Sequence, residues 1–507
     1  MKKTVLVIVI ITIFSKFLGL VREVSLSYFF GANNVTDAYL ISLTIPAVLF
    51  SFLGIALNTA YIPVCSHAMV EEGEEQVIKF TNNIVNILIV LCTIVVAITI
   101  LFTAPIVKLF AAGFGGETLN LAVKFTRISI FGIYFSGLVY IFTPYLQIKS
   151  SFVIPASIGL PMNIIIIFSM FVASKTHNVY LLSIGSVAAF LAQLLFILPF
   201  VFKKEYKFYF IFNVEDKYLR NLLTTAFPAI IGASVNQINV LVDRTIASTV
   251  AEGGISALDY ASKLNVFILG LFAIPISTVI FPLISKMAAE SNYEGLKKSL
   301  SEAISATNFL VIPSTVGVMV FSTPIVEMLF GRGAFDERAL QMTSSALFFY
   351  SIGMIGYALQ EVLAKVFYSM KDTKSPTTNS VIALLMNIIL NIVLSKFLGI
   401  AGLALATSIS AIVCTSLLFV SLRKKIGSFG LKEISISFIR IAIASVIMGA
   451  VAKVSYNMMI GIISKNLSLI SSIIIGSMVY FVMALLMKIK EVDEIVLKIK
   501  NVLRKGT

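Results

Sequence analysis

Charged side chains interrupt the first two apolar segments of the chain, and their types suit the binding of an anion. Lys16, Arg22 and Glu23 fall inside the first apolar segment, and Asp37 opens the second. An ionisable side chain at membrane depth costs a few kcal/mol to insert, so it usually faces a wet cavity or a charged partner. The two segments therefore predict membrane-crossing helices joined by a turn at residues 31–34 and bordering a hydrophilic, cationic cavity.

Composition places the whole chain in a membrane. Apolar residues make up 58% of the 507 residues, charged residues make up 13%, and the mean hydropathy is +0.99. A soluble domain has roughly 45–50% apolar and about 25% charged residues. Each crossing of the hydrocarbon layer needs roughly 20 apolar residues, so the chain has room for many crossings. The three cysteines lie in apolar segments without paired spacing, which predicts buried thiols.

The apolar segments predict an all-α integral membrane protein with about fourteen transmembrane helices. An even number of spans puts both termini on the same side of the membrane. The termini and the loops on their side hold 24 of the 39 lysines and arginines, and the loops on the opposite side hold only six. This asymmetry predicts that both termini are cytoplasmic. Nucleic-acid binding is excluded as an explanation of the net charge of +14, because the charges are scattered over short loops. The predicted spans are about 4–30, 36–64, 77–103, 120–147, 152–174, 179–202, 219–248, 254–286, 299–322, 339–369, 375–396, 401–422, 434–458 and 466–487.

The two ends of the chain have distinct patterns. The basic, apolar N-terminus resembles a signal peptide, but no small-residue cleavage site follows, which favours a first transmembrane helix. Apolar residues at helical spacing opposite lysines in 488–507 predict an amphipathic helix on the anionic cytoplasmic leaflet.

A weak internal repeat predicts how the spans are grouped. A shift of 219 residues aligns 36–66 with 255–285 without a gap, which equates the second span with the eighth. Equally oriented repeats predict two parallel six-helix lobes around a central cavity, plus two extra C-terminal helices. Lys263 of the second lobe then faces Lys16, Arg22 and Asp37 of the first. The predicted domains are an N-terminal lobe (1–202), a cytoplasmic linker (203–218), a C-terminal lobe (219–425), the last two spans (426–487) and a cytoplasmic tail (488–507).

Five short motifs together carry a resemblance to a known family. They are FSKFLGLVRE followed by FGANNVTDAY, NQINVLVDRTIAS at 236–248, ISALDYASKL at 255–264, LFGRGAFD at 329–336 and VFYSMKDTKSP at 366–376. The chain resembles the MurJ (MviN) lipid II flippases, which belong to the multidrug/oligosaccharidyl-lipid/polysaccharide exporters. The similarity covers the first twelve spans, and the last two match in number and place.

The resemblance implies a flippase of the bacterial cytoplasmic membrane that carries undecaprenyl-pyrophosphate-linked peptidoglycan precursor to the outer leaflet by alternating access. It implies no catalytic residue, action as a monomer, contacts with cell-wall synthases, and a groove at 426–487 for the lipid tail. By position, it assigns the pyrophosphate head group to Lys16, Arg22, Asp37 and Lys263. Lysine stands at 16 and 263, where the family commonly has arginine, so a point charge replaces a bidentate clamp.

A second departure lies in the second span. Some relatives carry two arginines and a glutamate there, where this chain has Phe50-Ser51 and Gly54-Ile55. Those cavity charges are missing, which leaves another lipid-linked head group open as the cargo.

Similarity to sodium-dependent members implies a candidate Na⁺ site as the only cofactor, formed by Asp243, Asn387, Asn391, Thr407 and the Leu403 carbonyl. A carboxylate with amide and hydroxyl oxygens suits a hard cation. Asn391 stands where such a site can carry aspartate. Two alternatives remain open: Asp243 forms an ion pair with Arg244, and the two asparagines, one turn apart, join neighbouring helices by hydrogen bonds.

Three other functions compete with this interpretation. The first is export of another undecaprenyl-linked glycan, such as a teichoic acid or a polysaccharide repeat unit, and nothing in the sequence excludes it. The second is a membrane glycosyltransferase, which needs carboxylates for metal or general-base work on an outer face. The outer loops are short and hold no Asp-x-Asp pair. The third is a cationic drug pump, which would present acidic residues to its cavity.

Overall fold

The computed structural model describes residues 2–489, 491 and 492, with side chains from residue 7 onward in the first helix. Those residues form seventeen helices and no strand, which confirms the all-α class. Almost all of the amphipathic tail predicted at 488–507 lies outside the described residues. The chain divides into two compact units, each described separately below.

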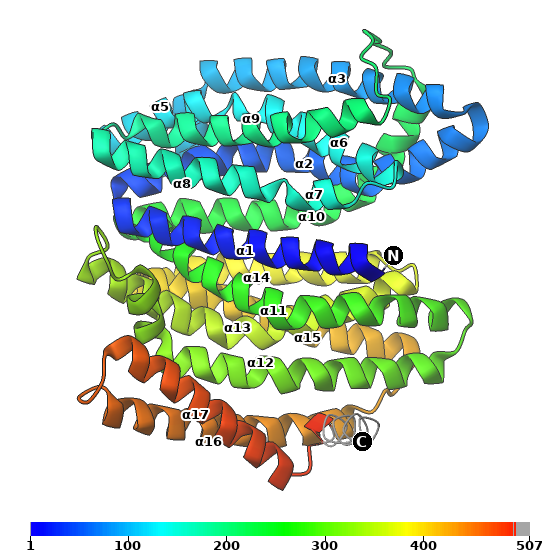
Figure 1. Cartoon of the computed structure of the whole chain (residues 1–507). Helices are drawn as coiled ribbons and strands as arrows, with labels where there is room; N and C mark the ends of the chain where they lie inside the picture. The colour runs from blue at the N-terminus through cyan, green and yellow to red at the C-terminus, as the bar shows by residue number, and fades with distance from the viewer. Residues whose placement is uncertain (1, 490, 493–507) are drawn as a thin grey trace. The chain divides into compact units, whose positions relative to one another are not determined.

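The first unit contains Met1–Ser256 and the short segment Arg332–Asp336. Helix α2 lies at its centre, where it packs against α5, α6 and α10, and α1 lies along α8 (Figure 1). The helices of this unit are α1 (Lys2–Phe30), α2 (Asn34–Glu72), α3 (Glu74–Leu101), α4 (Thr103–Phe110), α5 (Gly116–Ser129), α6 (Gly132–Ile148), α7 (Val153–Ser157), α8 (Gly159–Thr176), α9 (Tyr180–Lys203) and α10 (Lys217–Val250).

The second unit contains Ala257–Gly331 and the described residues from Glu337 onward. Helix α15 packs against α13 and α14, and α16 and α17 form a pair that packs on α12. Tyr480 on α17 donates a hydrogen bond of 2.7 Å to the Phe309 carbonyl of α12. The helices of this unit are α11 (Gly254–Ala289, from its fourth residue), α12 (Tyr293–Phe330), α13 (Glu337–Ser369), α14 (Lys374–Leu398), α15 (Ile400–Ile426), α16 (Leu431–Met459) and α17 (Lys465–Leu486).

The number of spans differs from the sequence prediction. Twelve helices of the described residues are long and apolar enough to cross a membrane, and the bent pair α5 and α6 would make a thirteenth. The span predicted at 120–147 is broken, because the chain turns by 43° between these two helices. Helix α1 is 29 residues long, but it is not among the twelve, which are counted over the described residues, and its side chains are described only from residue 7 onward. The count of about fourteen is therefore not confirmed.

The predicted domain boundaries were drawn from the internal repeat, whereas the two compact units are defined by which residues contact one another. Helix α10, assigned by the repeat to the second lobe, packs along α2 and belongs to the first unit. The predicted lobe boundaries stay a prediction, because contacts do not test the origin of a repeat.

The predicted turn between the first two helices is present and is tightly held. Helix α1 ends at Phe30, and the Asn33 side chain accepts hydrogen bonds from the backbone N–H groups of Val35 and Thr36 at the start of α2. Gly31 has a φ of +67°, and a Cβ atom there would lie 2.3 Å from the Ala334 carbonyl oxygen. Glycine is required at this turn both by its backbone conformation and by that close approach.

The loop between α13 and α14 contains an ion pair that predicts a dependence of stability on pH. Burial would raise the pKa of Asp372, but the Lys425 ammonium at 2.6 Å and hydrogen bonds from the Ser375 backbone N–H and hydroxyl lower it to about 2. The ordinary value is 3.8, so the folded state favours the charged carboxylate. The resulting stabilisation is present above pH 3.8 and is lost as the pH falls towards 2.

We expect a modest loss, roughly 1 kcal/mol or less, because Lys425 is partly exposed to solvent. The measurement is the thermal unfolding midpoint of the reconstituted protein between pH 5 and pH 2. Asp372→Asn should have a shallower pH dependence over that interval. An identical dependence in both proteins would contradict the assignment.

Candidate functional site

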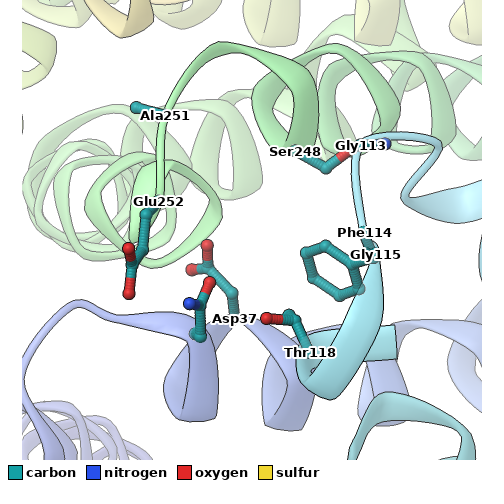
Figure 2. A pocket seen from close by; sticks show the side chains of 9 residues that line it. Asp37, Gly113, Phe114, Gly115, Thr118, Ser248, Ala251 and Glu252 are labelled. Carbon is teal, nitrogen blue, oxygen red and sulfur yellow. The ribbon is translucent and has the colours of Figure 1, made fainter. Parts of the chain in front are cut away.

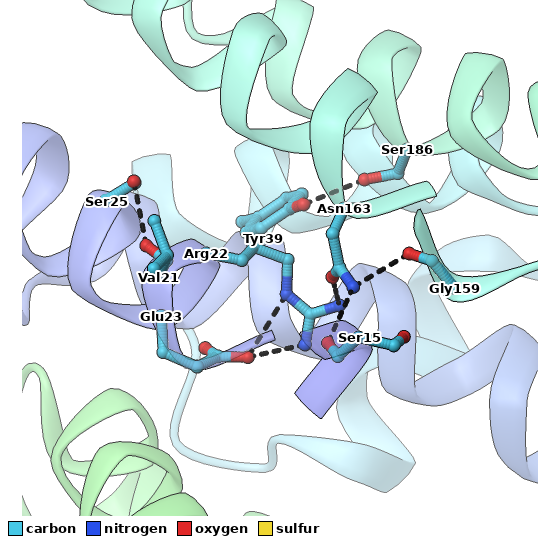
Figure 3. A network of polar contacts seen from close by, with 9 residues as sticks. All are labelled: Ser15, Val21, Arg22, Glu23, Ser25, Tyr39, Gly159, Asn163 and Ser186. Carbon is cyan, nitrogen blue, oxygen red and sulfur yellow. Dashed lines mark hydrogen bonds and ion pairs between the residues drawn. The ribbon is translucent and has the colours of Figure 1, made fainter. Parts of the chain in front are cut away.

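Arg22 lies at the centre of a polar cluster inside the first unit. Its Nε and Nη2 atoms donate to Glu23 Oε1 at 3.2 and 2.6 Å, and its Nη1 atom donates to Asn163 Oδ1 at 3.1 Å (Figure 3). Asn163, on α8, donates in turn to the Gly159 carbonyl at 2.8 Å. These contacts hold the guanidinium group at the α1–α8 interface.

The cluster combines burial with partial access. The Arg22 side chain is 22% exposed and the Glu23 side chain is 7% exposed. An arginine so placed requires a counter-ion, because an uncompensated charge in a poorly hydrated site is strongly unfavourable. Glu23 supplies that counter-ion and binds the guanidinium edge that could otherwise bind a phosphate in bidentate fashion. An incoming anion would therefore compete with Glu23 for Arg22.

Asp37 makes a different set of contacts from those of Arg22. It is buried in the first turn of α2, and its Oδ1 atom accepts hydrogen bonds from the Ser256 backbone N–H at 2.8 Å and from the Ser256 hydroxyl. Arg244 on α10 interacts electrostatically with the same carboxylate and donates to the Ile255 carbonyl at 3.0 Å. A carboxylate at the first turn of a helix satisfies N–H groups that have no partner within the helix. Asp37 thus ties the start of α2 to the α10–α11 connection.

A small polar pocket borders Asp37. Its cavity volume is about 150 Å³, and the side chains of Asp37 and Glu252 both point towards it (Figure 2). The remaining lining comes from the start of α2, the α4–α5 loop with the start of α5, and the end of α10. Gly113 of that loop donates its N–H to the Ser248 hydroxyl at 3.0 Å. This pocket is acidic and small, so it is unsuited to a pyrophosphate.

The two lysines of the predicted site are exposed. Lys16 lies on α1, six residues before Arg22, and Lys263 lies on α11 in the second unit. Neither forms a hydrogen bond or an ion pair with another residue in the part of the chain that the structure describes. Their charges are therefore available to a ligand, each within its own unit.

The structure brings together four of the five residues of the candidate ion site. Within the second unit, Asn391 donates to Asn387 Oδ1 at 2.7 Å, Asn387 donates to Thr407 Oγ1 at 3.4 Å, and Thr407 donates to the Leu403 carbonyl at 2.9 Å. This buried chain of hydrogen bonds joins α14 to α15. Asp243, the fifth residue, lies on α10 of the first unit. The observed bonds are those expected if the two asparagines join neighbouring helices.

Comparison with known proteins identifies the family. A model described as "Lipid II flippase MurJ" matches residues 26–477. The chain belongs to the MurJ family. A probable lipid II flippase MurJ from Vibrio cholerae is 31% identical over 459 residues, which cover 88% of this chain and 87% of that protein. The corresponding protein from Thermotoga maritima is 28% identical over 488 residues and 96% of each chain. The resemblance inferred from the five motifs is thus confirmed.

Solved structures agree with this membership. A lipid II flippase MurJ in an inward closed conformation matches with a TM-score of 0.81 and 29% identity, covering 94% of this chain and 98% of that one. A multidrug resistance transporter of the MATE family, in an inward-facing conformation, matches with a TM-score of 0.70 and 14% identity over 83% of this chain and 98% of that one. The second match shows a shared fold only. The apolar helices and MurJ membership make the chain a multi-pass inner-membrane protein.

Sequence reasoning within the MurJ pattern missed the partners of the predicted site residues. Glu23 was identified as a charge inside an apolar segment but not as the counter-ion of Arg22, because adjacent residues of a helix do not usually face each other. Asn163 was missed, and its signal is a single amide in an apolar segment. Ser256, the partner of Asp37, carried no signal, because a serine at a helix start most often caps its own helix.

Proposed function

We propose that this chain translocates undecaprenyl-pyrophosphate-linked peptidoglycan precursor, lipid II, from the inner to the outer leaflet of the cytoplasmic membrane. The observation that carries the proposal is the Arg22 cluster: a partly accessible guanidinium in an apolar helix, held by Glu23 and Asn163. A cation fixed in advance stabilises a pyrophosphate in a poorly hydrated cavity, where charge attraction is strongest. Membership of the MurJ family supports lipid II as the cargo.

In this proposal Arg22 binds the pyrophosphate, and the exposed Lys16 and Lys263 add charge from two further positions. Asp37 acts as a positioning residue that holds the start of α2 against the α10–α11 connection. Because the head group must be released, its affinity has to differ between inward- and outward-facing states, as alternating access requires. Glu23 contributes to release by replacing the departing phosphate at Arg22.

The orientation and assembly belong to the same proposal. Both termini are cytoplasmic, because the loops on their side hold 24 of the 39 lysines and arginines. The chain works as a monomer, the last two helices, α16 and α17, hold the lipid tail, and cell-wall synthases receive the product. Cysteine labelling at Arg332 and at Lys297, from outside intact cells, tests the orientation: the first site should react and the second should not.

The function is tested in cells depleted of the protein. The quantity to measure is the fraction of lipid II that an externally added lipid II-cleaving enzyme can reach. We expect depletion to lower that fraction and wild-type protein to restore it. If lipid II stays fully accessible after depletion while another undecaprenyl-linked glycan accumulates inside, the chain exports that glycan instead. The missing charges at residues 50–55 would then be the physical reason.

We propose, as a separate point, that Na⁺ is the coupling ion and binds at Asn387, Asn391, Thr407 and the Leu403 carbonyl. Oxygen donors of this kind suit a hard monovalent cation, and Asp243 would supply the charge. Replacing Na⁺ by K⁺ should slow transport by the wild-type protein, and Asn387→Ala should remove the difference. Equal rates in the two salts would leave the hydrogen-bonded chain as a purely structural link.

A further inference from the structure

The linker between α9 and α10, residues 204–216, is an extended segment rich in aromatic residues. Its sequence is KEYKFYFIFNVED. It has a turn near each end and no helix. The lipid II mechanism proposed above makes no use of it. Its conformation is nevertheless fixed, because side chains of α3 bind its backbone along most of its length.

Three buried asparagines of α3, Asn82, Asn83 and Asn86, hold this linker. Together their side-chain amides bind main-chain groups of residues 207, 209, 211 and 213, in the manner of a neighbouring strand. Asn82 accepts from the Tyr209 N–H (3.0 Å) and donates to the Lys207 carbonyl (2.9 Å); Asn86 donates to the carbonyls of Tyr209 (3.2 Å) and Ile211 (3.0 Å); Asn83 accepts from the Asn213 N–H (2.7 Å) and donates to its carbonyl (2.7 Å).

The hydrogen bonding leaves one face of the linker apolar and uncovered. Phe208, Phe210 and Phe212 alternate along it and are 56%, 82% and 49% exposed. Tyr206, which has the same parity, ends this exposed row, because it is buried and donates to Asn82 Oδ1 at 2.8 Å. Tyr209, which points the other way, is 49% exposed. Side chains two residues apart on an extended segment share a face. Three adjacent exposed phenylalanines on a rigid backbone are unfavourable in water.

The position of the asparagines along α3 indicates the depth of this apolar face in the membrane. Beyond Asn86, α3 is almost wholly apolar and exposes Val90, Ile94 and Ile98 on its surface, which marks its lipid-facing side. The asparagines lie in the last one and a half turns, roughly, before that stretch. The linker is therefore held where the hydrocarbon layer begins, at the depth where aromatic residues gather in membrane proteins.

The charges around the linker complement a phospholipid surface. Lys203, Lys204 and Lys207 are exposed at its first end, beside Glu205. Lys217, which pairs with Glu72 at 2.6 Å, and Arg220 follow its second end, after Glu215. Basic residues beside an apolar face are the combination by which interfacial segments bind anionic bilayers. A binding site for another protein would not require the segment to lie at this depth.

We propose that residues 206–214 form an interfacial membrane-binding segment. Phe208, Phe210 and Phe212 enter the boundary between head groups and acyl chains of the adjacent leaflet, and Lys203, Lys204 and Lys207 bind lipid phosphates. The linker thereby fixes the depth of α3 and of the ends of α9 and α10 in the bilayer.

The chain contains no tryptophan, so one introduced tryptophan reports its own surroundings. Phe210→Trp, in vesicles of mixed anionic and zwitterionic lipid, is compared in lipids brominated near the head group or deep in the acyl chain. We expect blue-shifted emission, quenched most by the shallow bromines. Ile94→Trp is the matched control in lipid, and Glu215→Trp is the matched control in water. Phe208→Trp repeats the measurement at a second position on the same face.

Two results would overturn the proposal. One is emission at the wavelength of Glu215→Trp with no quenching by either brominated lipid. The other is emission protected from a water-soluble quencher but insensitive to lipid bromine, which would indicate burial against protein. Neither result depends on lipid II transport, so this test and that of the proposed function fail independently.

Discussion

Arg22→Glu should abolish lipid II transport while the protein remains in the membrane. The substitution removes the guanidinium that would bind the pyrophosphate, and it places a second carboxylate beside Glu23. Removing one member of a buried, hydrogen-bonded charge pair costs about 2–5 kcal/mol, which corresponds to roughly a 30-fold or greater loss of binding. The measurement is the rate at which lipid II becomes accessible to an external lipid II-cleaving enzyme, normalised to the amount of protein in the membrane.

Arg22→Gln separates charge from folding, because glutamine keeps a donor for Asn163 and adds no negative charge. It should also lose transport. Arg127→Gln is the matched control: Arg127 is an exposed arginine on α5 that donates to the Thr103 hydroxyl, and its loss should leave transport unchanged. Lys263→Glu should resemble Arg22→Glu. Normal transport by either charge-reversed protein would show that the cavity assignment is wrong.

Asp37→Ala should have the second largest effect, and it should act on stability. The substitution leaves the Ser256 backbone N–H and hydroxyl without their acceptor in a buried position and removes the charge facing Arg244. Leaving a buried donor unsatisfied costs about 1–3 kcal/mol, with the larger values for bonds to charged groups. We expect a lower thermal unfolding midpoint in detergent and faster proteolysis at the α10–α11 connection.

Asp37→Asn serves as the control for this prediction. Asparagine keeps one acceptor oxygen for Ser256 but carries no charge, so its unfolding midpoint should lie between those of wild type and Asp37→Ala. Combining Ser256→Ala with Asp37→Ala should cost less than the sum of the two single losses, because both remove the same contact. Full additivity would mean that Asp37 stabilises the fold through other partners.

The sequence predicted local features well and distant partners poorly. The membrane class followed from composition, and the turn at residues 31–34 followed from Gly31 and Asn33, whose backbone conformation and helix cap are local. The close approach of Ala334 to Gly31 could not be predicted. Asn163, one of the two partners of Arg22, lies 141 residues away, and no periodic pattern connects the two positions. The break between α5 and α6 was missed, because an apolar segment has the same hydropathy whether straight or bent.

The candidate site was predicted in the same uneven way. Arg22 and Asp37 were identified because charges are rare in apolar segments, but their surroundings differ: one is held by Glu23 and Asn163 and the other by Ser256. The residue types alone could not show that Arg22 and Asp37 have different partners, because the partners depend on which helices pack together. The four members of the candidate ion site that lie on α14 and α15 do meet, because the pairing of consecutive helices is the simplest contact to predict.

The asparagines of α3 have a consequence for which substitutions the linker tolerates. They bind only main-chain groups of residues 207–213, and every residue type offers the same carbonyl. Proline is the exception, since it has no N–H to donate at 209 or 213. Between residues 207 and 213 the path of the linker is thus set by α3, whereas Phe208, Phe210 and Phe212 expose their side chains. The side chains of Tyr206 and Asp216, at the two ends, do bind the asparagines. Homologous chains can therefore exchange one aromatic or aliphatic residue for another there without altering the backbone.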